Sequence, residues 1–464
     1  MKHFIASSVP ALALSMSLSA AEPAPVAAPA PEAKPAAAPT EQQALAVTSP
    51  EQKALEALNE GNVDALRKLL DDGLDVNTIL GDGIRLIQAA FFTANVEAAN
   101  LLIERKADLT CVMPNGQSLA GLAAAANQPD LLMLLQEQGV NLNAQDKLGY
   151  PPLMVATVRG NLDAMQMLLA MKVDPNVEDK NGMRPIMVTL SLPDRNAANA
   201  AMQMLLEHKA DPNASAKNGP FLVTPLLVAI SKNNAEAVDM LLANGANPDL
   251  GDPISPLMRA AQVRDAATVE KLIKAGADVN KKQLYGGTPL QGAASVACPA
   301  VIDLLLKAGA DANATDDGGD TPLTNAAVGT NITTDLDDAM AGRSAYGRVP
   351  SLINAEESVS LLVKAGADVN RANAKGRTPL IIAALAADPG MCRLLLSLGA
   401  DKSAKDATGR TAADYAALTE EERLAEMYPL FPGAEKNEKL RKIITTAVQD
   451  NARGEECSTI LNAH

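Results

Sequence analysis

Histidine, the commonest general base in enzymes, occurs at only three positions in this sequence: His3, His208 and His464. Hydrolytic or acid–base catalysis needs such a base beside a nucleophile or a second carboxylate. His208 lies at the predicted end of a helix, where the negative helix terminus favours a cation, and no partner motif accompanies it. We therefore predict no catalytic residue and no enzymatic activity.

Motifs for phosphate, dinucleotide and metal binding give no stronger signal. The P-loop, HExxH, GxSxG and CxxC patterns do not occur. Gly81-Asp82-Gly83 has the start of a dinucleotide fingerprint but falls between predicted helices instead of after a strand. The acidic segment Asp316–Asp320, with Asp335, Asp337 and Asp338 further on, does not have the alternating ligands of a calcium loop and is typical of a hairpin turn. We predict no metal site and no cofactor.

Four cysteines occur, Cys111, Cys298, Cys392 and Cys457. The first three are separated by at least one whole repeat of the pattern described below, which exceeds the reach of a disulfide, so we predict free thiols. Cys392 falls in an apolar helical run and is expected in the core. Cys457, on a tail expected to be flexible, could pair with Cys392 or with another molecule, and spacing does not decide between these and a free thiol.

The composition favours a repetitive helical array. The 464 residues are 47% hydrophobic but only 2% aromatic, without tryptophan. A compact core of this size normally buries many aromatic rings, whereas stacked Ala- and Leu-rich helices do not need them. The 55 acidic residues outnumber the 40 basic ones, for a net charge of −15, and no basic stripe occurs. We therefore predict no nucleic-acid partner.

An internal period of about 33 residues supports the array. Thr-Pro-Leu occurs at Thr224, Thr288, Thr321 and Thr378, and each copy is followed by an Ala-rich stretch and a Leu-Leu pair. Seven of the ten intervals between successive unit starts have the same length. The aligned starts are Gln52, Arg85, Ser118, Pro151, Arg184, Thr224, Ser255, Thr288, Thr321, Thr378 and Thr411. Such agreement of motif and period predicts about eleven similar units.

Each unit can be interpreted as two helices and a hairpin. Thr-Pro opens an inner helix, because the hydroxyl caps free amides and proline needs no N–H there. A second, outer helix has apolar residues at helical spacing, as in Ile302, Leu305 and Leu306, and a glycine such as Gly309 ends it. The following Asp-x-Asn and a Gly-rich turn predict a projecting hairpin.

This pattern resembles the ankyrin repeat family. The resemblance implies an all-α solenoid of about eleven helix-turn-helix-hairpin units, with a groove lined by hairpins and inner helices. The family usually has histidine after Thr-Pro-Leu, where it links neighbouring loops. Here this position holds residues such as Gln88, Met258 and Gln291, so we expect packing to hold the loops instead.

The ends of the chain predict further segments. Lys2, the short apolar stretch 4–18 and Ser19-Ala20-Ala21 are typical of a signal peptide, 1–21, cleaved near Ala21. The segment 22–50 is Ala- and Pro-rich and predicts an extended tether. The array is predicted over 51–417, with an insert at 329–352. The segment 418–464 predicts a helical cap, with a capping box from Thr419 to Glu422, a helix over 434–450 and a frayed C-terminal end.

The resemblance also implies a function. Proteins of this family bind partners with the hairpin tips and the ends of the inner helices, and aromatic and Met side chains commonly anchor such interfaces. We predict a monomeric, non-enzymatic scaffold for a protein partner, periplasmic or secreted, without stable membrane insertion after signal cleavage. The alternatives are a secreted effector that acts on a foreign or host protein, and an enzyme with an unrecognised site. The predicted partner-binding residues are Phe92, Leu148, Tyr150, Val158, Met183, Leu192, Ile254, Val263, Leu284, Tyr285 and Val296.

Overall fold

The computed structural model describes residues 49–80, 83–218, 221–327, 352–427 and 451–463. The predicted signal peptide, most of the tether, nearly all of the insert and the helix expected at 434–450 lie outside these residues. The chain divides between Ala216 and Lys217 into two compact units. The N-terminal unit is described over 49–216 and the C-terminal unit over 217–463.

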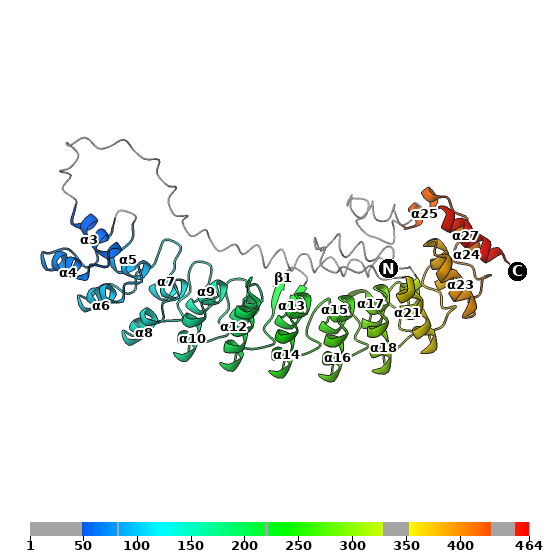
Figure 1. The fold of residues 1–464 in the computed structure, drawn as a ribbon, viewed down its shortest axis with the longest axis horizontal. Coiled ribbons are helices and arrows are strands. Elements are labelled where there is room, and N and C mark those ends of the chain that lie inside the picture. The colour runs from blue at the N-terminus through cyan, green and yellow to red at the C-terminus, as the bar shows by residue number, and fades with distance from the viewer. Residues whose placement is uncertain (1–48, 81–82, 219–220, 328–351, 428–450, 464) are drawn as a thin grey trace. The chain divides into compact units, whose positions relative to one another are not determined.

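The inner helices form one row in each unit, and each helix packs against the next (Figure 1). In the N-terminal unit they are α3 (Pro50–Asn59), α5 (Leu86–Phe92), α7 (Leu119–Ala125), α9 (Pro152–Arg159) and α11 (Pro185–Thr189). In the C-terminal unit they are α13 (Pro225–Ser231), α15 (Pro256–Gln262), α17 (Pro289–Ser295), α19 (Pro322–Ala327), α22 (Pro379–Leu385) and α24 (Ala412–Ala416).

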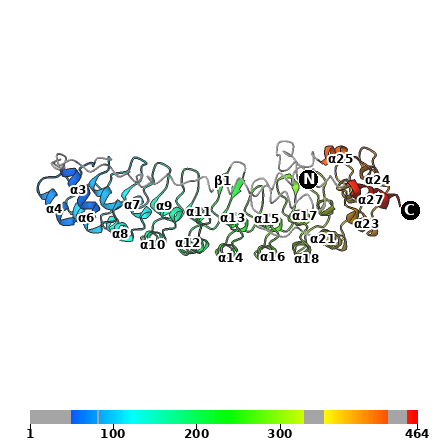
Figure 2. The ribbon, with the colours of Figure 1, turned by 45° about the horizontal axis from the view of Figure 1, so that its top comes forward.

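The outer helices form a second row in each unit, and hairpins connect each outer helix to the next inner one (Figure 2). In the N-terminal unit they are α4 (Val63–Asp71), α6 (Val96–Glu104), α8 (Pro129–Glu137), α10 (Leu162–Ala170) and α12 (Arg195–Glu207). In the C-terminal unit they are α14 (Ala235–Ala243), α16 (Ala266–Lys274), α18 (Pro299–Lys307), α21 (Leu352–Lys364) and α23 (Pro389–Ser397). Two further helices, α25 (Glu420–Met427) and α27 (Asn451–Asn462), follow at the C-terminal end.

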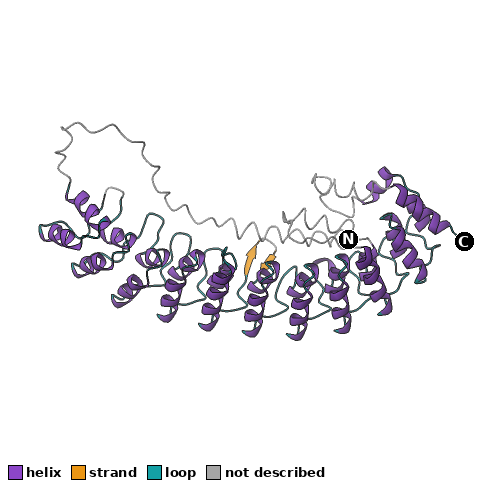
Figure 3. Cartoon of the chain, viewed as in Figure 1, coloured by secondary structure: helices purple, strands orange, loops and turns teal. Residues whose placement is uncertain are grey.

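Extended structure is slight in the described ranges (Figure 3). Strands β1 (Ala216–Asn218) and β2 (Phe221–Val223) form a two-stranded sheet, and the 3₁₀ turn η2 spans Leu284–Gly286. None of the described helices combines the length and apolar character needed to cross a membrane. The all-α solenoid predicted from the sequence is confirmed.

The inner helices α13, α15, α17, α19 and α22 begin where Ser or Thr precedes Pro, as predicted. Helices α5, α7, α9, α11 and α24 do not begin with this pair. The Thr288 hydroxyl caps α17 by accepting the Gln291 N–H at 3.4 Å, and the Gln291 side chain accepts the Thr288 N–H at 2.8 Å. The first unit differs, because α3 begins at Pro50 with Ser49 as its cap. The predicted start, Gln52, lies inside this helix, and its side-chain oxygen accepts the Ser49 N–H at 3.1 Å. The Ser-Pro signature therefore lies just before the predicted start.

Small and apolar side chains form the core between the two rows. Ala260 and Ala293 on the inner helices are fully buried, as are Leu241, Leu272 and Leu305 on the outer helices. Burial of each leucine contributes about 2 kcal/mol. Because alanines let the inner helices lie close together, neighbouring units share one continuous core and no unit is covered on its own.

Asparagine side chains link neighbouring hairpins, where packing alone was expected. In the Asp-x-Asn segment, Asp278 accepts the N–H of Asn280 at 2.9 Å. The Asn280 side chain then reaches the next hairpin, where its Oδ1 accepts the Asp311 N–H at 2.9 Å and its Nδ2 donates to the Gly309 carbonyl at 3.0 Å. The same link to the next aspartate N–H is made by Asn77, Asn176, Asn313 and Asn370. This asparagine ladder satisfies backbone N–H and carbonyl groups of the next hairpin.

Backbone contacts also join the hairpin tips. The Ala407 N–H donates to the Lys375 carbonyl of the preceding tip at 2.9 Å. Gly376 makes this approach possible, because its φ is +73° and a Cβ there would lie 2.6 Å from the Ala407 nitrogen. The hairpins are therefore fixed to one another at their tips as well as at their bases.

The C-terminal end departs from the prediction. The capping box of α25 is present, since the Glu422 carboxylate accepts the Thr419 N–H at 2.9 Å. The last residues, expected to fray, instead form α27, which packs against α23 and α24. It therefore lies where the outer helix of the last repeat belongs. Gly454, Cys457 and Leu461 are buried on α27 and recur at helical spacing, so they form one face.

Candidate functional site

The predicted binding residues of the N-terminal unit keep part of their surface exposed. Phe92, at the end of α5, is 53% exposed, and Leu148, in a hairpin, is 54% exposed. The other four are half-buried, namely Tyr150, Val158, Met183 and Leu192.

Asp146 positions the hairpin that presents Leu148. Its Oδ1 accepts the backbone N–H groups of Leu148 and Tyr150, both at 2.8 Å. Burial and the nearby carboxylates of Asp179 and Asp146 raise the pKa of the Tyr150 phenol, so this side chain is neutral at physiological pH. The turn is thus held by its own carboxylate, and Leu148 needs no packing partner to stay in place.

The next hairpin repeats this geometry around Met183. Asp179 accepts the N–H groups of Asn181 and Met183, both at 2.8 Å. Leu192 lies over the end of α9, where a Cβ on Gly160 would meet it at 3.5 Å. The Met183 and Leu192 side chains are therefore each partly packed against the fold and partly exposed.

The predicted binding residues of the C-terminal unit are less exposed. Ile254 and Val296 are buried, each 8% exposed, so they offer little surface to a partner. The Leu222 N–H donates to the Asp252 carbonyl at 2.7 Å, which ties β2 to the segment just before Ile254. Val263 and Tyr285 are half-buried, and the Leu284 side chain is outside the described set.

Two exposed residues were missed by the sequence analysis. Ile79 is 59% and Val112 is 57% exposed, and they occupy equivalent hairpin positions one repeat apart. Alignment of the repeats could have identified them, because both stand at the same position of the repeat. Each forms the antiparallel bridge at the base of its hairpin. We use the name apolar hairpin surface for Ile79, Phe92, Val112 and Leu148 together.

The exposed large hydrophobic side chains of the described ranges all belong to the N-terminal unit. Four form the apolar hairpin surface, and the fifth, Met133, is 44% exposed on the outer helix α8. Water-exposed apolar side chains gathered on one face commonly mark an interaction site. The strongest candidate surface therefore lies on the hairpin side of the first units.

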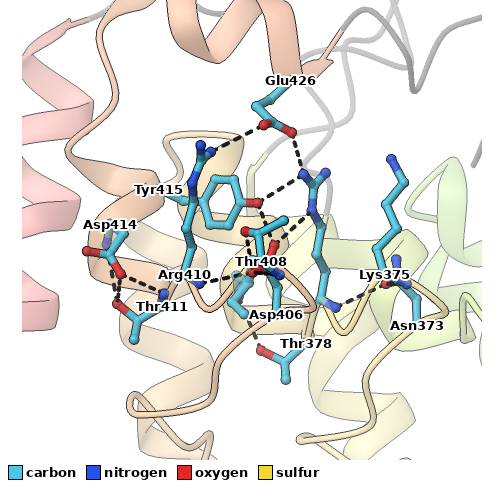
Figure 4. Close-up of polar contacts among 12 residues, drawn as sticks. Asn373, Lys375, Thr378, Asp406, Thr408, Arg410, Thr411, Asp414, Tyr415 and Glu426 are labelled. Carbon is cyan, nitrogen blue, oxygen red and sulfur yellow. Dashed lines mark hydrogen bonds and ion pairs between the residues drawn. The ribbon is translucent and has the colours of Figure 1, made fainter.

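A cluster of charged residues at the C-terminal end is the other candidate (Figure 4). The Arg377 guanidinium is buried, donates to the Tyr415 hydroxyl at 3.0 Å and pairs with Glu426. Arg410 pairs with the same carboxylate at 3.2 Å, and both guanidinium groups lie over the Tyr415 ring. Glu426 thus joins α25 to two successive hairpins.

Asp406 shows that this cluster is structural. Although burial raises its pKa, hydrogen bonds from Tyr415, Thr408 and the backbone bring the pKa to about 2. The Tyr415 hydroxyl donates to it at 2.7 Å, and the backbone N–H groups of Thr408 and Arg410 donate at 2.9 and 3.0 Å. A carboxylate engaged by so many donors is a poor general base, so the cluster stabilises the end of the array.

The chemistry-bearing residues singled out in the sequence occupy ordinary structural positions. His208 is exposed at the C-cap of α12. Asp316 accepts the N–H groups of Gly318 and Asp320 at 2.9 and 2.8 Å, as Asp146 does in its own hairpin. Within the described ranges, no three His, Cys, Asp or Glu side chains are grouped as metal ligands.

Paired helices, an asparagine ladder and exposed hairpin tips define a helical repeat protein of the class that presents a binding surface. The family model for ankyrin repeats in three copies matches residues 86–179, 159–252, 257–334 and 351–439. These ranges cover more than half of the chain, which therefore belongs to the ankyrin repeat family. Ankyrin repeats are generally protein–protein interaction modules and are typically not enzymes. A comparison with curated proteins gives no match.

Proposed function

We propose that this chain is a monomeric, non-enzymatic scaffold that binds a partner protein through the apolar hairpin surface of its N-terminal unit. The observation that carries this proposal is the exposure of Ile79, Phe92, Val112 and Leu148, each above one half. These side chains project from elements that internal hydrogen bonds already hold. A preformed surface loses little conformational entropy on binding, so a few apolar anchors suffice for affinity.

The half-buried residues would border these anchors. Tyr150 and Met183 follow Leu148 along successive hairpins, and both have part of their surface free. Aromatic and Met side chains adapt well to a protein partner, since one is rigid and broad and the other flexible. The proposed surface is confined to the N-terminal unit, so the half-buried Val263 and Tyr285 and the buried Ile254 and Val296 are left out of it.

The test compares exposed apolar side chains of the apolar hairpin surface with one on an outer helix. The full chain captures its partner from an extract of the producing cells, and the partner is then purified for titration. Phe92→Ser with Leu148→Ser should weaken binding about 30-fold or more, because two interface anchors are lost. Met133→Ser is the matched control, since it removes an exposed apolar side chain from α8. Equal affinity of the double variant and the control would reject this surface.

Export is a separate part of the proposal and rests on the sequence from Met1 to Ala21. A chain that begins at Glu22 in the periplasmic fraction would support it, as measured by the mass of the N-terminal peptide. The same processed chain in the medium would favour the secreted effector. An unprocessed chain in the cytosol would contradict export in either form.

A further inference from the structure

Two cysteines far apart in the sequence meet at the C-terminal end. Cys392 is on α23 and Cys457 is on α27, and both side chains are fully buried. Helices α23 and α27 pack against each other, each of the two thiols shifts the pKa of the other, and all four cysteines of the chain are free. The other two, Cys111 and Cys298, belong to different units. The fold thus places one pair of these thiols in the same helix-to-helix interface.

Neighbouring contacts fix α27 in the register that brings the two sulfurs together. Arg393 and Glu456, each next in sequence to one of the cysteines, form an ion pair between α23 and α27. Lys402 donates to the carbonyl of Ala463 at 3.0 Å near the end of the same helix. The thiol contact is therefore part of a specific helix-to-helix interface.

A buried arginine lies against the same helix. The Arg423 side chain is 2% exposed, and its Nη2 donates to the carbonyls of Ala416 and Leu418 at 3.1 and 3.3 Å. Its Nε and Nη1 have no hydrogen-bond partner within the described residues. Gly454 makes room for it, because a Cβ there would lie 2.7 Å from the Arg423 Nη2. A buried guanidinium that pairs with no carboxylate of the described residues favours a nearby anion.

The two thiols differ in acidity. The hydrogen bond from Cys392 and the charge of Arg423 lower the pKa of the Cys457 thiol, against burial and the carboxylates of Asp388 and Glu456. The hydrogen bond to Cys457 and burial raise the pKa of Cys392, and Arg393 opposes this shift. Cys457 is therefore the better nucleophile, since the thiolate is the reactive form.

We propose that Cys392 and Cys457 are a redox-active thiol pair that a disulfide compound oxidises to an intramolecular disulfide, which locks α27 onto the last repeat. When α27 opens locally, the Cys457 thiolate attacks one sulfur of the reagent and releases one reagent thiol. While α27 is still open, Cys392 loses its proton to solvent, and its thiolate attacks the Cys457 sulfur of the mixed disulfide as the helix closes. A second reagent thiol leaves, so two protein thiols and one disulfide become one protein disulfide and two thiols.

The bond would change how firmly the last helix is held. It closes a loop that includes α24, α25 and most of α27, and cross-linking a loop of this length opposes local opening. Hydrogen exchange in α27 should slow by about 30-fold to 1,000-fold on oxidation. In the reduced state the same helix can open, so the redox state sets whether the end of the array is permanently covered.

The test uses the full chain in buffers of reduced and oxidised glutathione, followed by alkylation in denaturant and peptide mass analysis. We expect the oxidised protein to yield one linked peptide pair with Cys392 and Cys457, while Cys111 and Cys298 are alkylated. Slower hydrogen exchange should be confined to the peptides of α27 and α23. The proposal is overturned if Cys392 and Cys457 are alkylated like the other two, or if Cys457 stops at a glutathione adduct.

Single substitutions separate the roles of the residues. Cys298→Ser is the control and should leave the linked pair unchanged, whereas Cys392→Ser should leave Cys457 as a glutathione adduct with no redox effect on α27. Arg423→Gln should move the pH profile of the oxidation rate to higher pH, and Arg423→Lys should restore part of the shift. An unchanged pH profile would remove Arg423 from the proposal. The peptide map of the unmodified chain tests the thiol pair even if these variants fold poorly.

Discussion

Asn280 is bonded to Asp311 across two neighbouring hairpins, with the side-chain oxygen of one accepting the backbone N–H of the other at 2.9 Å. The same asparagine donates to the Gly309 carbonyl at 3.0 Å. One side chain therefore satisfies both a donor and an acceptor of the next repeat. This link recurs in both units.

Removal of this link should weaken the array. Asn280→Ala is expected to lower the free energy of unfolding by about 1 to 2 kcal/mol, because two backbone groups lose their partner at a partly exposed site. Asn280→Asp keeps the acceptor for Asp311 but cannot donate to Gly309, so it should cost about half as much. Urea unfolding measures both. If the alanine and aspartate variants were equally stable, the donated bond would have no role.

Two glycines allow the cost of an unfavourable backbone conformation to be measured separately from the cost of a steric clash. Gly376 and Gly366 both have positive φ, +73° and +93°, but a Cβ would meet the Ala407 nitrogen at 2.6 Å only at Gly376, with nothing within 4 Å at Gly366. Gly366→Ala should therefore cost about 1 to 2 kcal/mol from backbone strain. Gly376→Ala should cost clearly more, because the tip-to-tip hydrogen bond must also break. Comparable thermal denaturation of the two variants would refute this difference.

Truncation of the adjacent residues Phe91 and Phe92 should affect the stability of the fold to very different extents. Phe91 is fully buried, whereas Phe92 is 53% exposed. Phe91→Ala is expected to cost about 3 to 5 kcal/mol in the free energy of unfolding. Phe92→Ala should change it by less than about 1 kcal/mol. A large loss for Phe92→Ala would show that its ring supports the fold, and loss of binding in its variants would then have no value as evidence for a surface.

Acid should reveal the contribution of Asp406. Its pKa is lowered to about 2 in the folded chain, so its stabilisation is present above the ordinary carboxyl range and is lost as pH falls through about 2. Tyr415→Phe removes one donor and raises the folded pKa of Asp406. The variant should lose about 1 to 2 kcal/mol at neutral pH and unfold at a higher pH than the parent. Tyr150→Phe, in the other unit, is the control, and circular dichroism against pH distinguishes the two.

The repeat architecture could be predicted because its signals are local. Thr288 and Gln291 form their capping box within a single helical turn, and the constant period repeats this signal along the chain. The asparagine ladder was missed because its bonds join different repeats. Asp-x-Asn indicates a turn, but nothing in one unit shows that its amide reaches the next.

The exposure of apolar residues near the hairpins and the docking of the last helix could not be predicted, because both depend on tertiary contacts. Ile254 and Ile79 are both isoleucines near hairpins, yet one is 8% and the other 59% exposed. The segment just before Ile254 is bonded to β2, which lies outside the regular period, and no such strand accompanies Ile79 in the described ranges. The buried face of α27 has Leu461 as its large apolar residue beside Gly454 and Cys457, which is too weak a pattern to distinguish a docked helix from a frayed end.

The ladder also governs how the length of this chain can change. Asp249 accepts the Asp278 N–H at 3.1 Å, and Asn280 accepts the Asp311 N–H at 2.9 Å one repeat later. Deletion of the segment 278–310, which is one whole period, would bring Asp311 to the place of Asp278 and offer Asp249 the same donor. Whole repeats can therefore be lost or duplicated during evolution while the hydrogen bonds between successive hairpins are kept. Loss of a single hairpin residue would instead leave one of these bonds without its donor.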